Sequence, residues 1–123
     1  AAEALAALCE ILALSREWAQ EMETRFGPIG LRVNGAATAG TVVFTALGDE
    51  HRLEYTVIGD PVNLAAKLEK HNKVEQTLGL TTRASLDMAQ AQGFRPPAAA
   101  SLTRLDRRQV QGVDAPLDLV AFA

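Results

Sequence analysis

Two polar residues of this chain, Asn63 and Lys67, have types and a spacing suited to binding an anion. They lie four residues apart in a segment whose pattern predicts a helix, so their side chains share one face. That face lies near the start of the helix, where the helix dipole and unsatisfied N–H groups stabilise negative charge. The pair is therefore a candidate ligand site. A capping or solvent-facing asparagine and a solvated surface lysine are the alternatives.

The sequence around this pair, LEYTVIGDPVNLAAKLEKHN, predicts a strand, a tight turn and a helix in direct succession. Apolar and polar residues alternate from position 53 to 57, which is typical of a half-buried strand. Gly59 permits a sharp turn, Asp60 is a suitable N-cap, and Pro61 fits the first helical turn. We expect this helix to end near His71 and Asn72, with His71 at the surface.

The remaining elements are predicted from hydrophobic periodicity and from turn residues. They are a helix over 2–25, strands at 31–33 and 41–45 joined by NGAATAG, a strand at 77–80, a helix from Thr82 to about Ala91, and an antiparallel pair at 104–110 and 117–122. This order predicts an α+β fold with an antiparallel or mixed sheet and helices on one side.

Composition limits the classes of function. The chain has 123 residues, 48% hydrophobic content and a net charge of −3, which suit a single globular domain and give no general attraction to nucleic acid. A single cysteine, Cys9, is expected to be a buried apolar residue in a reducing compartment. The apolar start AAEALAALCEILAL is too short and too interrupted to insert into a membrane. We therefore expect a cytoplasmic location for this segment, and a membrane anchor elsewhere in the parent protein stays open.

Other acidic or imidazole groups do not form a convincing metal site. Asp60 is explained by capping, and Asp49-Glu50-His51 is typical of a polar hairpin turn. The chain also has no glycine-rich phosphate loop of the two common kinds. We predict no metal ligand in this sequence.

The run YTVIGDPVNLAAKLE resembles the signature of class III nucleotidyl cyclases, the catalytic domain of adenylate and guanylate cyclases. The resemblance extends from about Leu31 to the end of the chain and is strongest over 53–69. It implies that residues 1–123 are one domain, the C-terminal part of an incomplete ferredoxin-like cyclase homology domain. The two aspartates that hold Mg²⁺ or Mn²⁺ in the family lie in an N-terminal part that this chain lacks.

The resemblance also implies roles for three residues. Asn63 matches the asparagine that orients the ribose, and Thr56 matches the position that reads the purine. Lys67 stands where the family usually has an arginine that stabilises the developing phosphate charge. Lysine keeps the charge but lacks the planar fork, so we expect weaker stabilisation of the transition state. A β-branched residue with only a strand-forming role is the alternative for Thr56.

The function implied by the resemblance is conversion of ATP to cyclic AMP and pyrophosphate, by a homodimer or together with a second cyclase domain. Adenine is favoured over guanine by Thr56 alone. Residues 1–123 by themselves are expected to be inactive because they lack the paired carboxylates. A catalytically inactive module for nucleotide binding, dimerisation or regulation is the alternative. We also expect the isolated chain to self-associate through exposed apolar surface.

Overall fold

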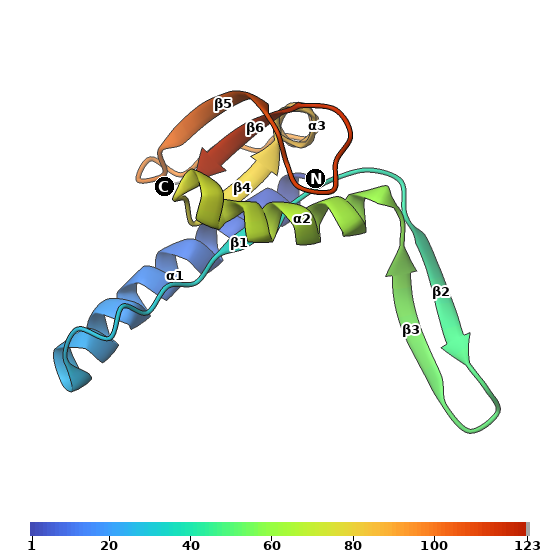
Figure 1. The fold of residues 1–123 in the computed structure, drawn as a ribbon, viewed down its shortest axis with the longest axis horizontal. Helices are drawn as coiled ribbons and strands as arrows, with labels where there is room; N and C mark the ends of the chain where they lie inside the picture. The colour runs from blue at the N-terminus through green and yellow to red at the C-terminus, as the bar shows by residue number, and fades with distance from the viewer. Residues whose placement is uncertain (123) are drawn as a thin grey trace.

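The computed structural model describes residues 1–122, and its core is a four-stranded mixed sheet with three helices (Figure 1). The strand order is β1-β4-β6-β5, in which β1 is parallel to β4 and the other neighbours are antiparallel. The elements are α1 (Ala2–Phe26), β1 (Gly35–Ala37), β2 (Val43–Gly48), β3 (Leu53–Ile58), α2 (Asp60–Glu75), β4 (Gly79–Thr82), α3 (Arg83–Ala91), β5 (Leu102–Arg108) and β6 (Leu117–Phe122). The expected α+β class with a mixed sheet is confirmed.

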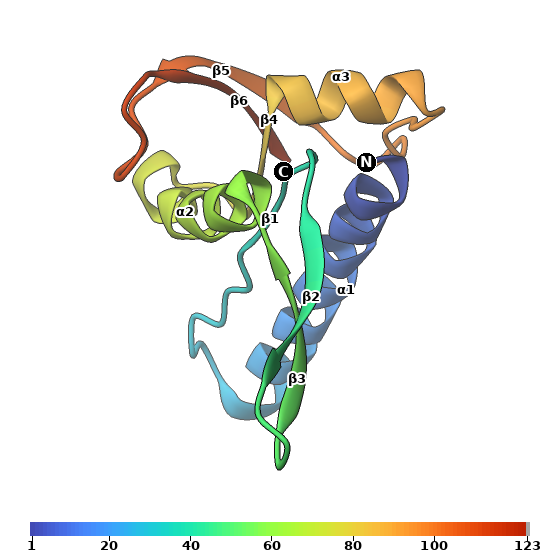
Figure 2. The same cartoon turned by 90° about the vertical axis from the view of Figure 1, so that its right-hand side faces the viewer.

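Helices cover both faces of this sheet, which differs from the expected placement on one side. Alternate residues of β6 face opposite ways: Leu119 packs in a cluster with Leu68 of α2, whereas Val120 packs in a cluster with Leu8 of α1 and Leu86 of α3. Figure 2 shows α2 on one side of β4 and β1, and α1 with α3 on the other. Cys9 is buried in the second cluster as expected, and burial raises the pKa of its thiol.

Strands β2 and β3 form a separate antiparallel hairpin that projects away from the sheet (Figure 1). The alternation in β3 predicted a half-buried strand, but this prediction is wrong. Phe44, Leu53 and Tyr55 each expose more than two thirds of their surface, and the rings of Phe44 and Tyr55 stack with their centroids 5.7 Å apart. Within residues 1–122, no other layer covers the apolar face of the hairpin.

Helix α2 starts one residue earlier than the sequence indicated. Its N-cap is Gly59, with φ 157°, and Asp60 is the first helical residue and makes no side-chain capping bond. A residue with a Cβ at this φ would be strained, and the added atom would lie 3.0 Å from the carbonyl oxygen of Thr41. Glycine therefore fits the N-cap position better than an aspartate would.

The same helix runs on to Glu75 because buried Asn72 ties it to the sheet. The Asn72 amide nitrogen donates to the carbonyl oxygen of Gly35 at 2.9 Å, and its oxygen accepts from the Thr77 hydroxyl at 2.9 Å. The expected end near His71 and Asn72 is therefore wrong by one turn.

Residues 31–33 are not a strand, which corrects another expectation. The strand lies at Gly35–Ala37 inside the segment expected to be a connection, and it pairs with β4 rather than with β2. The absence of a side chain at Gly35 also lets β1 lie close to α1, since a Cβ at this position would be 2.8 Å from the Leu8 side chain. By contrast, α3 begins as predicted, because the Thr82 hydroxyl accepts from the Ser85 N–H at 3.0 Å.

The helices within residues 1–122 are all too short or too polar to cross a membrane.

Candidate functional site

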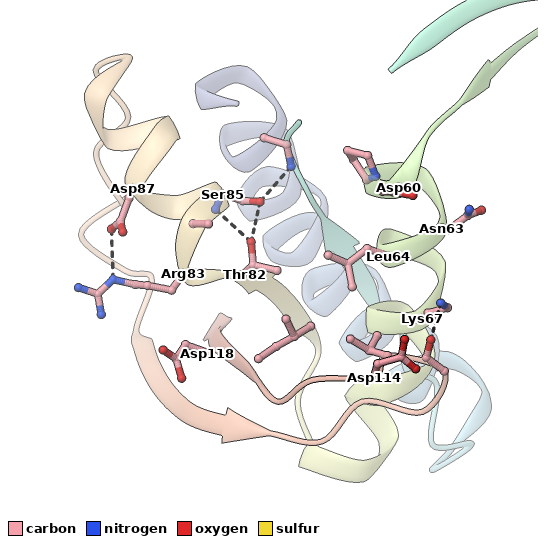
Figure 3. Close-up of a pocket in the computed structure, with 16 residues that line it drawn as sticks. Asp60, Asn63, Leu64, Lys67, Thr82, Arg83, Ser85, Asp87, Asp114 and Asp118 are labelled. Carbon is pink, nitrogen blue, oxygen red and sulfur yellow. Dashed lines mark hydrogen bonds and ion pairs between the residues drawn. The ribbon is translucent and has the colours of Figure 1, made fainter. Parts of the chain in front are cut away.

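Asn63 and Lys67 lie on the first turns of α2, beside a pocket with a volume of about 890 Å³ (Figure 3). The pocket lies between the N-terminal turns of α2 and α3 and the loop that precedes β6. Its size is within the range of small-molecule sites. The structure thus brings the two predicted residues together on one helix face that borders a cavity.

The ammonium group of Lys67 donates a hydrogen bond to the carbonyl oxygen of Gly112, with Nζ and O 2.7 Å apart. No carboxylate forms an ion pair with Lys67 anywhere in residues 1–122. No ion pair therefore offsets the charge of Lys67, and two of its three N–H donors remain available to a ligand.

The side chain of Asn63 is exposed, and Figure 3 shows it pointing away from Thr82 and Ser85 on the far side of the pocket. No side-chain hydrogen bond of Asn63 is formed within the described residues. Its amide is thus free to bind a ligand or a neighbouring chain. The capping alternative for Asn63 is not supported, because the N-cap is Gly59.

Thr56 does not line this pocket. It lies on β3 of the projecting hairpin, is half-buried, and stands directly opposite Thr45 of β2. Residues opposite one another in an antiparallel pair point to the same face. Two hydroxyl groups therefore share one face of the hairpin, and only one of them was singled out from the sequence.

Hydrogen bonds fix the start of α2 against the rest of the site. The Thr38 hydroxyl donates to the carbonyl oxygen of Pro61 at 2.6 Å, and the Ala39 N–H donates to the Ser85 hydroxyl at 2.9 Å. Ser85 in turn accepts from the Thr82 hydroxyl at 2.8 Å. The segment after β1 thus joins the first turns of α2 and α3, so the pocket has a defined wall.

Four aspartates and two basic residues line the pocket, so it carries a net formal charge of about −2. Asp87 pairs with Arg83 at 3.1 Å, and Asp118 accepts from the Arg107 N–H at 2.9 Å. Among residues 1–122 no three carboxylate, imidazole or thiol groups lie close enough together to hold a metal ion. These residues therefore do not fit a two-metal centre.

His71 is buried, and this corrects its expected surface position. Its side chain is 5% exposed, and its Nε2 lies 3.0 Å from Oε1 of Glu75. Arg108 of β5 also approaches Glu75, at 3.2 Å. This group joins α2 to the edge strand and lies outside the pocket. The expected hairpin turn after β2 is confirmed, since the Asp49 carboxylate accepts from the N–H groups of His51 and Arg52.

Sequence reasoning missed Gly112 and the other pocket residues that come from α3 and from the loop before β6. The segment QGVD contains a recognisable turn glycine, but nothing in its local pattern indicates which distant side chain its carbonyl contacts. Its pairing with Lys67 depends on how β5 and β6 pack under α2.

Comparisons with known proteins point to one class. No family model matches the chain. Adenylate cyclase 1 of Rhizobium meliloti (strain 1021) is 37% identical over 101 residues, which cover 76% of this chain and 13% of that protein. Adenylyl cyclase CyaB from P. aeruginosa shares the fold, with a TM-score of 0.66 and 18% identity over 98% of this chain and 58% of that one. A bacterial light-regulated adenylyl cyclase aligns with a TM-score of 0.51 and 20% identity, over 69% of this chain and 22% of that one.

The resemblance to the class III nucleotidyl cyclase catalytic domain is confirmed, and the chain is related to bacterial adenylyl cyclases in sequence and in fold. It spans only a small fraction of the length of the Rhizobium protein that it matches in sequence.

Proposed function

We propose that this chain is the C-terminal part of an adenylyl cyclase catalytic domain, which in the complete protein converts ATP to cyclic AMP and pyrophosphate. One observation carries the proposal: an exposed amide and an ammonium without a carboxylate partner, Asn63 and Lys67, stand one turn apart beside a pocket. The sequence match to an adenylate cyclase supports it.

The reaction joins the ribose 3′ oxygen to the α-phosphorus of the same nucleotide while the bond to pyrophosphate breaks. The Asn63 amide donates to the ribose ring oxygen and holds the sugar in line for attack, which lowers the entropic part of the barrier. The Lys67 ammonium, with its charge unneutralised, stabilises the negative charge that develops on the phosphate oxygens. Thr56 offers a hydroxyl that both donates to and accepts from the adenine edge.

A second chain completes the site in this proposal. Divalent ions, Mg²⁺ or Mn²⁺, supply charge neutralisation and activation of the attacking oxygen when they are bound. Residues 1–122 do not fit such ions, so in this proposal the ligands of the ions come from a partner chain. The outward direction of Asn63 supports this arrangement, because its exposed amide is accessible to a neighbouring chain. A closed dimer repeats the site twice.

A catalytically inactive cyclase-homology module is the second candidate. One observation favours it: position 67 carries a lysine, and its ammonium is already bonded to Gly112 of its own chain. Such a module retains dimerisation or nucleotide binding without turnover. For either function we propose a cytoplasmic location, supported by the single free and buried Cys9.

The test is an assay of cyclic nucleotide formation by the complete protein that contains this chain, with Mn²⁺ and either ATP or GTP. We expect cyclic AMP from ATP, and we expect Lys67→Met to lower kcat by about a hundredfold. The matched control is Lys70→Met on the same helix, where an exposed lysine lies outside the pocket. A complete protein that binds ATP and makes no cyclic nucleotide supports the inactive module instead.

A further inference from the structure

The contact between Lys67 and Gly112 gives the lysine a defined position that its own side chain cannot provide. A lysine side chain has four rotatable bonds and a compact charge, whereas an arginine presents a rigid fork. Here the ammonium is held at one point by a backbone carbonyl 2.7 Å away. A neutral carbonyl orients the group without offsetting its charge, whereas a carboxylate partner would add a negative charge beside it.

The loop that supplies this carbonyl is itself held firmly. The Val113 N–H donates to the carbonyl oxygen of Val110 at 3.0 Å, which closes a four-residue turn with Gly112 at its third position. The φ of Gly112 is 83°, as a type II turn requires there. Val110 is 1% exposed and packs in one cluster with Leu68 of α2. The turn is thus anchored beneath the helix that carries Lys67.

Gly112 also lies too close to the lysine side chain to accept a larger residue without a shift. A Cβ added at this position would lie 3.2 Å from Cε of Lys67 and 3.6 Å from Nζ. The left-handed backbone therefore favours glycine at this position, and a larger residue would in addition displace the end of the lysine side chain by a few tenths of an ångström.

From these contacts we propose that Gly112 is a positioning residue for Lys67. Its carbonyl fixes the ammonium at the edge of the pocket, with two N–H donors directed to a phosphorylated ligand, and so supplies a fixed geometry that a flexible lysine side chain lacks by itself. The proposal rests on the proposed function for its catalytic consequence, while the contact itself can be measured without turnover.

The first measurement is the rate at which acetic anhydride acetylates Lys67, relative to Lys70 in the same molecule, determined by mass spectrometry. We expect Gly112→Ala to raise this ratio several-fold, because the displaced ammonium loses its carbonyl partner. Gly93→Ala is the control: its φ is 92° and nothing lies within 4 Å of an added Cβ, so it strains the backbone without touching Lys67. An unchanged ratio in Gly112→Ala overturns the proposal.

The second measurement is a double-mutant cycle on the complete protein. We expect Gly112→Ala to lower kcat by about tenfold with little change in KM, as a displaced catalytic group does. In a Lys67→Met background the same substitution should change kcat less than about twofold, since it then has no lysine to displace. An equal loss in both backgrounds overturns the positioning role.

The two measurements together separate this proposal from the proposed function. A raised acetylation ratio in a protein whose wild type makes no cyclic AMP contradicts the proposed function and leaves the contact established.

Discussion

The ammonium of Lys67 lies 2.7 Å from the carbonyl oxygen of Gly112, 45 residues further along the chain. This contact joins the helix that follows the hairpin to the loop before the last strand, so two distant segments shape one edge of the pocket. It also gives the flexible side chain of Lys67 a fixed place at the edge of the pocket. The proposed catalytic role of the site requires that this ammonium and the nearby Asn63 amide both contact a bound nucleotide.

Replacement of Asn63 by alanine should remove the group that orients the ribose. We expect kcat to fall by about a hundredfold, because misplacement of the attacking oxygen costs that much, with a smaller effect on KM. The side chain is exposed and forms no bond within the described chain, so thermal stability should not change. Gln90→Ala, which removes an exposed amide from α3, is the control. Equal activity of Asn63→Ala and wild type would exclude the assigned role.

Thr56→Val keeps the shape of the side chain and removes its hydroxyl. If this hydroxyl reads adenine, the ratio of kcat/KM for ATP over GTP should fall by about tenfold, the value of one good hydrogen bond. Steady-state assays with both nucleotides give the ratio, and Thr103→Val on β5 is the control. An unaltered ratio would leave Thr56 with a role only in forming the strand.

Asn72→Ala tests how α2 is fixed to the sheet. The buried amide bonds the carbonyl oxygen of Gly35 and the hydroxyl of Thr77, and alanine leaves both unpaired. We expect the free energy of unfolding to fall by about 2–3 kcal/mol, measured by denaturant titration. Lys73→Ala, an exposed neighbour on the same helix, should change it by less than about 0.5 kcal/mol. Similar losses of unfolding free energy in the two variants would contradict a stabilising role of the Asn72 hydrogen bonds.

The exposed hairpin should drive self-association of the isolated chain. The side chains of Phe44 and Tyr55 are 69% and 74% exposed and stack on one face, which is unusual for a surface that remains in water. Sedimentation velocity should show oligomers that Phe44→Ser weakens. Val74→Ser, at a position on α2 that is 72% exposed, should leave them intact. A well-dispersed monomer at high concentration would count against this surface.

Local spacing predicted the candidate pair but not its surroundings. The strand, the turn and the helix that carry Asn63 and Lys67 follow one another without a break, so their order and shared face could be predicted from about fifteen residues. The contact with Gly112 could not, because it forms only after β5 and β6 pack beneath the helix. The carbonyl that holds the lysine is part of the backbone, and no residue type indicates its partner.

The same distinction applies to the fold. Helix α3 was predicted correctly because its cap, Thr82, is a local signal. Strand β1 was misplaced because Gly35 and its neighbours have little strand propensity, and only parallel pairing with β4 makes them a strand. Burial of β3 was predicted from alternation, yet the hairpin has no layer in this chain to cover it. Contacts with distant segments, which β1 makes and the hairpin lacks, thus decided the two outcomes that the local pattern did not predict.

Asn63 and Lys67 are proposed to act on a nucleotide whose metal ions are held by another chain. A mixing experiment with two variants of the complete protein tests this: one variant carries Asn63→Ala, and in the other the acidic residues that hold the metal ions are replaced by alanine. Each variant alone should be inactive, and the mixture should regain cyclic AMP formation, because a mixed dimer contains one complete site. A mixture that stays inactive although mixed dimers form would contradict the account.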